Sequence, residues 1–392
     1  MARSTRSATR AAAGTIRLAI PDGYVARWLS EPGDRALIER WTAASREACA
    51  YNTPSYVEFA RAQNGKADLL WLVRDGTPVL GLPLHPVGDS RVTTGYSGLM
   101  FPDGAGDGPL RRGVDALLAL LAANKRLGFE VLQSAQAPAY DDPARVNSLA
   151  FLLDRHGLGG PPLYSRVIEL APLAARSEAN PDLSSELLLA HGPMGSYDAK
   201  LRNQIRQAVR RGLHASCVLP STDADIQAAY RDFMPIHQES WQRTGMTPHP
   251  LNYWTALARS IVDGGGRDMV VFVRDCDDTA LATVTCHLRD DRALYWAGAS
   301  REQGLRSRAN PLCLHAAIQA CTQLGVKYFE LGRFHARERA QKELAITRYK
   351  AQFGGGLVRI VGFQTQPPVV AAALRRALRL LGAGDVSRDA SR

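Results

Sequence analysis

The order of sequence patterns along this chain repeats once, and this repeat most limits how the chain can fold. Short blocks in the first half recur in the same order roughly 200 residues later. The matched blocks are Tyr56 with Tyr253, Val73-Arg74-Asp75 with Val273-Arg274-Asp275, and Leu127-Gly128 with Leu324-Gly325. No single identity is informative, but collinear blocks at nearly one spacing indicate two related halves.

Hydrophobic periodicity predicts the same succession of helix, helix, hairpin, helix and strand in both halves. In the first half these elements cover 32–62, 68–87, 110–127 and 129–132, and Asp75-Gly76 forms the hairpin turn. In the second half they cover 223–261, 269–287, 311–324 and 326–331, with a further strand over 293–297. We therefore expect an α/β (α+β) fold with two similar lobes that arose by duplication. Two unrelated α/β domains are the alternative.

The expected domain boundaries follow from these halves. They are a disordered basic tail over 1–14, lobe one over 15–170, a linker over 171–195, lobe two with the active cleft over 196–365, and a C-terminal amphipathic helix and tail over 366–392. The strand that starts at Tyr164 is expected to be the last strand of lobe one. Contact of the C-terminal helix with a membrane surface is the minor interpretation.

Charge, hydrophobic runs and cysteine spacing limit which partners and which cellular compartment the protein can have. The formal net charge of +10 suits an anionic partner such as a phosphorylated substrate, a nucleic acid or an acidic membrane surface. No apolar run reaches the roughly 18 residues of a membrane span, and the N-terminus lacks the apolar core of a secretory signal. The six cysteines are scattered without metal-ligand spacing, which predicts reduced thiols, no metal and a cytoplasmic protein.

The first candidate site lies between Lys327 and Gly356. A short apolar strand carries Glu330 near its end, and Arg333 follows Gly332. Further on, Lys350 precedes three consecutive glycines, where backbone can come close to a ligand. The residues are candidates for an acid–base group and for binding anions; a structural ion pair and a surface lysine are the alternatives.

A second candidate is the predicted helix over 197–214. Arg202, Arg206 and Arg210 recur at intervals of four and so share one helical face. Like charges at this spacing repel one another, so the stripe suggests that phosphates bind nearby. A solvated basic face is the alternative.

A third candidate is the stretch from Ser300 to Pro311, read as a basic loop that leads to a helix with Asn310 as N-cap and Pro311 at its first position. Such a helix start can bind an anion. GNAT-type acetyltransferases bind a pyrophosphate there with Gln/Arg-x-x-Gly-x-Gly/Ala. Arg301 and Gly304 resemble that pattern, whereas Arg306 replaces its small residue.

Several enzyme signatures are absent from the sequence: a Gly-x-Ser-x-Gly elbow, a P-loop, a Cys/His nucleophile pattern and a carboxylate cluster for a metal. Their absence favours a transferase that works by positioning and electrostatics without a covalent intermediate.

Taken in order, the motifs of the second half resemble those of Fem-type aminoacyl and peptidyl transferases and the related GNAT N-acyltransferases associated with exopolysaccharide genes. These motifs are Lys200-x-Arg-x-x-Ile-x-x-Ala, the segment Trp241 to Gly245, Tyr295-Trp-Ala-Gly, the helix from Asn310, Tyr328-Phe-Glu-Leu-Gly and Arg348-Tyr-Lys-Ala-Gln-Phe-Gly-Gly. The resemblance covers most of lobe two and is weaker over lobe one. It implies two tandem GNAT-like lobes, each a mixed, mostly antiparallel sheet flanked by helices.

The resemblance also implies the roles of individual residues. Lys350, Glu330 and Tyr295 would be catalytic, with Lys350 steadying an oxyanion and Glu330 or a water accepting a proton. The acyl donor would contact Arg301, Gly304, Arg306 and Asn310. The acceptor would contact Arg202, Arg206, Trp241 and Arg333.

The expected function is transfer of an acyl group, from acyl-CoA as cosubstrate, to an amine on an anionic cell-envelope or polysaccharide precursor, with no permanently bound cofactor. One alternative is a Fem-type transferase that uses aminoacyl-tRNA to build peptide crossbridges. The long helical arm found in many tRNA-dependent Fem proteins is absent, which weakens that alternative. A second alternative is a non-catalytic protein that binds nucleic acid or another anion.

Overall fold

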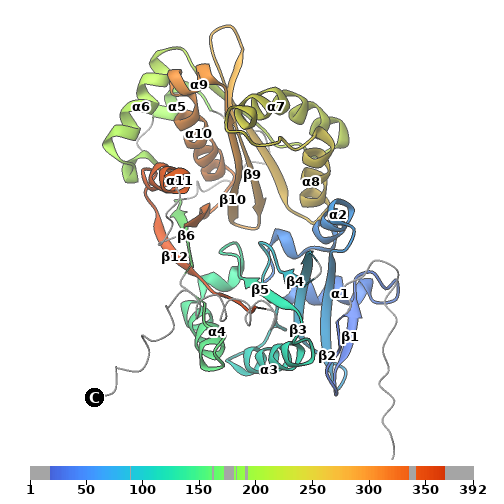
Figure 1. Cartoon of the computed structure of the whole chain (residues 1–392). Helices are drawn as coiled ribbons and strands as arrows, with labels where there is room; N and C mark the ends of the chain where they lie inside the picture. The colour runs from blue at the N-terminus through green and yellow to red at the C-terminus, as the bar shows by residue number, and fades with distance from the viewer. Residues whose placement is uncertain are drawn as a thin grey trace, which may run out of the picture. The chain divides into compact units, whose positions relative to one another are not determined.

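The computed structural model describes residues 18–366 apart from 89, 161–162, 172–180, 182, 190–192 and 335–340 (Figure 1). The chain forms two compact units, each built around one sheet. Unit 1 lies within residues 1–48, 60–161 and 361–392, and unit 2 within 49–59 and 162–360. The expected N-terminal tail and C-terminal helix, and His335 with most of the polar run after it, lie outside the described residues.

Unit 1 is a six-stranded sheet with the order β1-β2-β3-β4-β5-β13. Its strands are β1 (Val25–Trp28), β2 (Asp68–Arg74), β3 (Thr77–Val87), β4 (Arg91–Thr93), β5 (Gly128–Leu132) and β13 (Gly362–Gln364). Its helices are α1 (Arg35–Ala44), α3 (Gly108–Ala123) and α4 (Pro143–Arg155), and α2 (Pro54–Asn64) enters it at Ala60. Side chains of β2 point alternately to the two faces of the sheet. Leu70 and Leu72 pack with α3 and α4, whereas Trp71 faces α1 and donates a hydrogen bond to the Thr42 hydroxyl.

Unit 2 is a seven-stranded sheet with the order β12-β6-β11-β10-β9-β8-β7. Its strands are β6 (Leu163–Glu169), β7 (His214–Val218), β8 (Arg267–Arg274), β9 (Ala280–Arg289), β10 (Arg292–Ser300), β11 (Tyr328–Phe334) and β12 (Gly356–Ile360). Its helices are α5 (Ser185–Leu189), α6 (Ala199–Arg210), α7 (Asp223–Arg243), α8 (Leu251–Asp263), α9 (Glu302–Ser307), α10 (Ala309–Gln323) and α11 (Gln341–Ala351).

Two hydrophobic clusters hold unit 2 together, one on each face of its sheet. One cluster joins α6 and α10 to the sheet through residues such as Ile205 and Ile318. The other joins α7 and α8 to it through residues such as Phe233 and Leu257. Figure 1 shows α7 and α8 beside β9, with α6 and α10 on the other side of that strand.

Five successive strands of each sheet match in order, β1 to β5 in unit 1 and β7 to β11 in unit 2, as the sequence repeat predicts. In each sheet four antiparallel strands run in sequence, β1 to β4 in unit 1 and β7 to β10 in unit 2. Each fourth strand then pairs with the next in parallel, β4 with β5 and β10 with β11. Val73 and Val273 lie on the equivalent strands β2 and β8. The expected mixed, mostly antiparallel sheets flanked by helices are therefore confirmed.

The strand beyond each parallel pair comes from an unexpected part of the chain. The strand predicted to start at Tyr164 is expected to end lobe one, and this expectation is wrong: the strand is β6, paired with β11 and β12 of unit 2. Unit 1 instead receives β13, which pairs with β5. Strand pairing is nonlocal, so the chain position of a strand does not decide which sheet it joins. The predicted domain boundaries themselves remain a prediction.

Local turn chemistry explains why the hairpin of unit 1 forms where expected. Asp75 and Gly76 both have positive φ, as a two-residue hairpin turn of the Asp-Gly type requires. Arg74 pairs with Thr77 directly beside this turn, and a bulge between Leu72 and Val73 offsets the register behind it. The matching turn in unit 2, between β8 and β9, also contains a positive-φ aspartate, Asp278.

Candidate active site

The strands β10 and β11 lie side by side only at their beginnings. Their parallel pairing covers Arg292 to Leu294 opposite Tyr328 to Glu330 and then stops, although both strands continue. Each strand also carries a register shift just beyond that point, between Tyr295 and Ala297 in β10 and between Glu330 and Gly332 in β11. Bulges of this kind bend strands and often re-aim side chains at functional sites. We call the region after Leu294 and Glu330 the strand divergence.

Two of the predicted catalytic residues meet at this divergence. The Lys350 Nζ atom, from α11, lies over the Tyr295 ring at 5.6 Å from its centroid, within the range of a cation–π contact. Gly332 makes this approach close, because a Cβ atom there would lie 3.3 Å from the Lys350 Nζ atom. Gly332 also has φ of 86°, a conformation that L side chains rarely adopt.

The third predicted catalytic residue, Glu330, is almost fully buried at 4% exposure. Its Oε1 atom accepts a hydrogen bond of 2.5 Å from the Ser165 hydroxyl of β6. Burial lowers the pKa of Lys350, and the nearby Glu330 carboxylate partly opposes that shift. Burial also raises the pKa of Tyr295 above its ordinary value, which keeps its hydroxyl protonated. The divergence thus combines a carboxyl group, an ammonium group and a phenol.

The residues beside Lys350 in the chain are closely packed. Tyr349 packs edge-on against Phe353, and its buried hydroxyl has no hydrogen-bond partner among the described residues. Arg166 donates to the carbonyl oxygens of Gly354 and Gly355. A Cβ atom at Gly354 or Gly355 would come within 3.0 Å of neighbouring backbone, so the chain passes there only as glycine. These glycines therefore serve close backbone packing behind Lys350.

The predicted substrate residues are spread around unit 2. Arg202 of α6 donates to the Tyr197 carbonyl oxygen at the start of its own helix. Arg206 lies one turn further along α6 and is partly exposed. Arg333, near the end of β11, pairs with Ser165 across the sheet and is also partly exposed. Trp241 lies in the last turn of α7, among other aromatic rings.

The stretch from Ser300 to Arg308 is not the loop that its glycine and arginines predict. Strand β10 extends to Ser300, and α9 follows at once. The long helix α10 begins at Ala309, and its N-cap is Arg308 with φ of 69°, so Asn310 is not the N-cap as predicted. A residue in the left-handed conformation between two helices lets the chain change direction there.

The residues expected to hold a pyrophosphate do not fit one in this arrangement. The Glu239 carboxylate of α7 accepts the Glu302 N–H at 2.9 Å and lies 4.0 Å from the Arg301 guanidinium, so it occupies the start of α9. Arg306 pairs with Glu302 on the surface. Gly304 is buried against the Leu281 carbonyl oxygen. A carboxylate at this helix start would repel a second anion.

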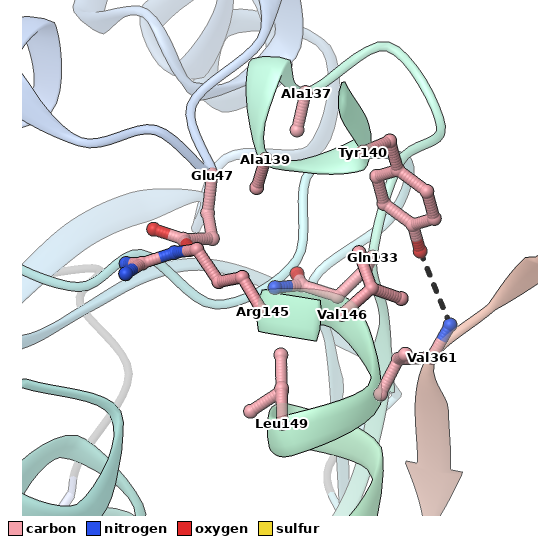
Figure 2. A pocket seen from close by; sticks show the side chains of 9 residues that line it. All are labelled: Glu47, Gln133, Ala137, Ala139, Tyr140, Arg145, Val146, Leu149 and Val361. Atoms are coloured by element: carbon pink, nitrogen blue, oxygen red, sulfur yellow. Dashed lines mark hydrogen bonds and ion pairs between the residues drawn. The ribbon is translucent and has the colours of Figure 1, made fainter. Parts of the chain in front are cut away.

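Unit 1 contains a pocket that none of the predicted site residues lines, and Figure 2 shows it. The Arg145 Nε atom pairs with the Glu47 Oε1 atom at 2.5 Å, and both side chains are buried. The Tyr140 hydroxyl accepts the Val361 N–H at its edge. The other lining residues are Gln133, Ala137, Ala139, Val146 and Leu149. The arginine is already neutralised, so this pocket offers no free charge for a substrate.

Sequence reasoning missed Ser165 and Gly298. Ser165 was assigned to the other lobe, so its bond to Glu330 could not be anticipated. Gly298 belongs to the quoted Tyr-Trp-Ala-Gly motif, and a Cβ atom there would lie 2.3 Å from the Tyr295 hydroxyl oxygen. The glycine three residues after the tyrosine was the available signal, since glycine admits a close approach.

The comparisons with known proteins agree with this geometry. Residues 199–351 match the family described as acetyltransferase (GNAT) domain. The fold is similar to a crystal structure of FemX, with a TM-score of 0.51 and 10% identity over 86% of this chain and 98% of that one. It is also similar to the C-terminal domain of a putative lysylphosphatidylglycerol synthetase from Agrobacterium fabrum, with a TM-score of 0.54 and 13% identity over 88% of this chain and 96% of that one.

The chain has a Fem-like GNAT fold. The expected resemblance is therefore confirmed, and the GNAT match covers the unit 2 elements from α6 to α11. A comparison with curated protein sequences gives no match. Within the described residues, no helix combines the length and the apolar character needed to cross a membrane.

Proposed function

We propose that this GNAT-like protein transfers an acyl group to an amine at the strand divergence of unit 2. The observation that carries the proposal is the position of Lys350, whose ammonium lies against the Tyr295 ring and Gly332, with the buried Glu330 close by. A fixed positive charge beside a buried carboxyl group suits a reaction in which an oxyanion develops while a proton leaves.

In the proposed reaction the neutral amine attacks the donor carbonyl carbon and forms the new C–N bond. The carbonyl oxygen gains negative charge, which the Lys350 ammonium stabilises more strongly in the transition state than in the bound substrate. Glu330 accepts the proton that the amine loses, directly or through a water, and passes it to solvent. Collapse of the intermediate re-forms the carbonyl and expels the leaving group as thiolate or alkoxide. The Tyr295 hydroxyl can donate its proton to that leaving group and regain one from solvent, which restores the neutral phenol.

The donor is an activated acyl thioester or ester. Acyl-CoA is the donor class of GNAT acetyltransferases, but Glu239 fills the helix start where its pyrophosphate would be expected. No step is therefore assigned to the CoA moiety. Aminoacyl-tRNA is the second candidate, and the fold likeness to FemX and to a lysylphosphatidylglycerol synthetase domain favours it. Both neighbours also favour an acceptor from the cell envelope. A cytoplasmic location and a polysaccharide precursor as acceptor are part of the same proposal.

The test is a product search by mass spectrometry. Purified protein is incubated with acetyl-CoA or with a mixture of aminoacyl-tRNAs, and with amino sugars, nucleotide-linked amino sugars and peptides as acceptors. An acceptor that gains the mass of the donor's acyl group supports the proposal and identifies the donor. Absence of product from every pair, together with thermal stabilisation by tRNA or DNA alone, would replace the transferase with a binding protein.

A further inference from the structure

Five aromatic rings form a continuous cluster where α7 ends and α8 begins, and we call it the α7–α8 aromatic cluster. Its members are His237, Trp241, His249, Tyr253 and Trp254. The His249 and Tyr253 rings stack at 4.1 Å between centroids, and Trp241 lies 5.3 Å from His249. These three rings are partly exposed, so aromatic surface faces solvent here.

Beneath the exposed rings lie polar atoms without partners. His237 is fully buried, and neither of its ring nitrogens has a hydrogen-bond partner among the described residues. Trp254 is 2% exposed, and its indole nitrogen lacks a partner as well. Buried polar atoms are nearly always bonded, and a buried indole N–H usually finds an acceptor. A cluster that served only packing would be better built from phenylalanine, so these nitrogens point to a ligand.

The cluster is uncharged. Burial, with a smaller contribution from His249, lowers the pKa of His237 to about 4, so its imidazole is neutral near pH 7. Burial also lowers the pKa of His249. A neutral imidazole has one donor and one acceptor nitrogen, and the indole adds a donor. The matching ligand group is therefore neutral, has a ring face that can stack, and carries groups that both donate and accept hydrogen bonds.

The cluster lies beside the end of β10, beyond the point where β10 leaves β11. Arg243, two residues after Trp241, donates from its Nη1 atom to the Ser300 carbonyl oxygen at 3.0 Å. Glu239, two residues before Trp241, accepts from the Glu302 N–H. Both contacts tie the last turns of α7 to the carboxyl end of β10. The cluster is thus fixed next to the carboxyl end of β10, the strand that also carries Tyr295.

We propose that the α7–α8 aromatic cluster binds a neutral sugar ring of the acceptor, an inference that rests on the proposed acyl transfer. A pyranose offers apolar C–H faces to Trp241 and Tyr253, and its hydroxyls both donate and accept, as the His237 and Trp254 nitrogens require. A nucleobase could also stack there, but each polar group at its edge either donates or accepts, whereas every sugar hydroxyl can do both. Binding of a base in place of a sugar is therefore an outcome against the proposal.

The experiment measures binding, so it does not depend on turnover. Saturation-transfer NMR is recorded with N-acetylglucosamine, its β-1,4-linked tetramer and uracil on the wild type and on Trp241→Phe, Trp241→Ala and His237→Phe. We expect saturation of sugar ring protons in the wild type and a loss of affinity of about tenfold in Trp241→Ala and His237→Phe, with a smaller loss in Trp241→Phe. His237→Phe keeps an aromatic side chain and removes both ring nitrogens.

The controls separate this inference from the proposed reaction. Trp41→Ala changes a partly exposed tryptophan of unit 1 that packs against Trp71 and should leave sugar binding unchanged. Lys350→Met should bind sugar like the wild type even if turnover is lost. Three results would each overturn the inference: no sugar signal in the wild type, unchanged affinity in both Trp241→Ala and His237→Phe, or a signal from uracil alone.

Discussion

The two sheets place the same residue types at matching positions and surround them differently. In unit 1 the parallel pair aligns Thr93 with Glu130, and in unit 2 it aligns Leu294 with Glu330. Glu330 is buried, bonded to Ser165 and close enough to Lys350 to influence its pKa. Glu130 is partly exposed, and no charged partner for it is found among the described residues.

The region beyond each parallel pair also differs. In unit 1 side chains bridge it: Thr94 accepts from the Leu132 N–H, and Gln133 forms two hydrogen bonds with the Leu99 backbone. A Cβ atom at Gly98 would clash with Gln133, so this region is tightly filled. In unit 2 the equivalent region holds Tyr295 and Lys350. The comparison teaches that one strand order can surround its divergence differently: among the described residues, the unit 2 divergence brings together a carboxyl group, an ammonium group and a phenol, and the unit 1 divergence is bridged by Thr94 and Gln133.

The sharpest test of this contrast exchanges each glutamate for glutamine. We expect Glu330→Gln to lower turnover by about 10²–10⁴, the usual contribution of a positioned acid–base group, and Glu130→Gln to leave turnover unchanged. The measurement is kcat with the acceptor found in the product search. Equal rates for the two variants would mean that Glu330 has no part in proton transfer and that a water acts alone.

Replacing Lys350 tests the second group that unit 1 lacks. Lys350→Met should reduce turnover by about 10²–10³, as the loss of one oxyanion donor does. Lys350→Arg should restore little of the turnover, because the planar guanidinium spreads the charge that the lysine ammonium concentrates at one atom. The melting temperature should change little. Lys327→Met, which removes an exposed lysine paired with Asp291, is the matched control. Near-normal turnover in Lys350→Met would remove this residue from the mechanism.

A third pair of matched residues, Asp68 and Asp268, predicts opposite effects on stability. Asp68 is the first residue of β2, and Asp268 is the second residue of the matching strand β8; both are buried. Asp68 pairs with Arg61 at 2.7 Å and accepts from the Ser30 hydroxyl. Asp268 accepts from the Tyr230 hydroxyl and lies 3.5 Å from His287, and burial raises the pKa of Asp268 to about 7.

The sign of the pH effect follows from the pH at which the Asp268 carboxyl group loses its proton in the unfolded and in the folded chain. The unfolded chain releases the Asp268 proton near pH ~4, whereas the folded chain keeps it up to about pH 7. Stability is therefore lost as pH rises from ~4 to about 7, by at most ~4 kcal/mol. His287 has the opposite pH dependence. Burial lowers the pKa of His287 to about 3, so its contribution to stability is lost as pH falls below ~6.5.

Asp268→Asn should accordingly stabilise the protein at pH 8 and change little at pH 4, since the amide is neutral at both. Asp68→Asn should destabilise it by about 1–3 kcal/mol, because the Arg61 guanidinium loses its carboxylate. Urea unfolding of both variants at the two pH values measures these differences. A loss of stability in Asp268→Asn at pH 8 would show that its carboxylate is compensated in the fold.

Much of the fold could be read from local patterns. The repeat predicted the matching strand order, and Asp75-Gly76 predicted its hairpin, because turn chemistry and alternation are local. The destination of β6 could not be read, since Leu163 to Glu169 is equally suitable for either sheet and pairing is decided by tertiary structure. The stretch after Ser300 was misread because glycine and arginine suggested a loop, whereas Gly304 packs against Leu281 within a helix.

The candidate site shows the same division. Tyr295, Glu330 and Lys350 were singled out by their motifs, and the structure brings these three side chains together. Arg301 and Arg306 were singled out by a motif as well. The carboxylate partner of Arg306 is Glu302, four residues before it, but the partner of Arg301, Glu239, could not be predicted. Glu239 is distant in sequence, and no pattern links it to α9. Short motifs therefore picked out three side chains that the structure brings together, and their roles in a reaction stay a prediction.

The smallest expected effect concerns Ser165, the contribution of β6 to the divergence. Its hydroxyl is fully buried and donates to Glu330, so it fixes the orientation of that carboxyl group without touching the substrate. Ser165→Ala should lower kcat by about tenfold, the worth of one hydrogen bond to a charged group, and leave KM unchanged. Ser165→Thr keeps the hydroxyl and should recover most of the rate. A purely structural serine would instead lower the melting temperature in Ser165→Ala without changing kcat.

In unit 1 the residue that pairs with Glu130 is Gln364 of β13, so Gln364→Ala should have no effect on turnover. If Gln364→Ala and Ser165→Ala slow the reaction equally, the two divergences are not distinct in function.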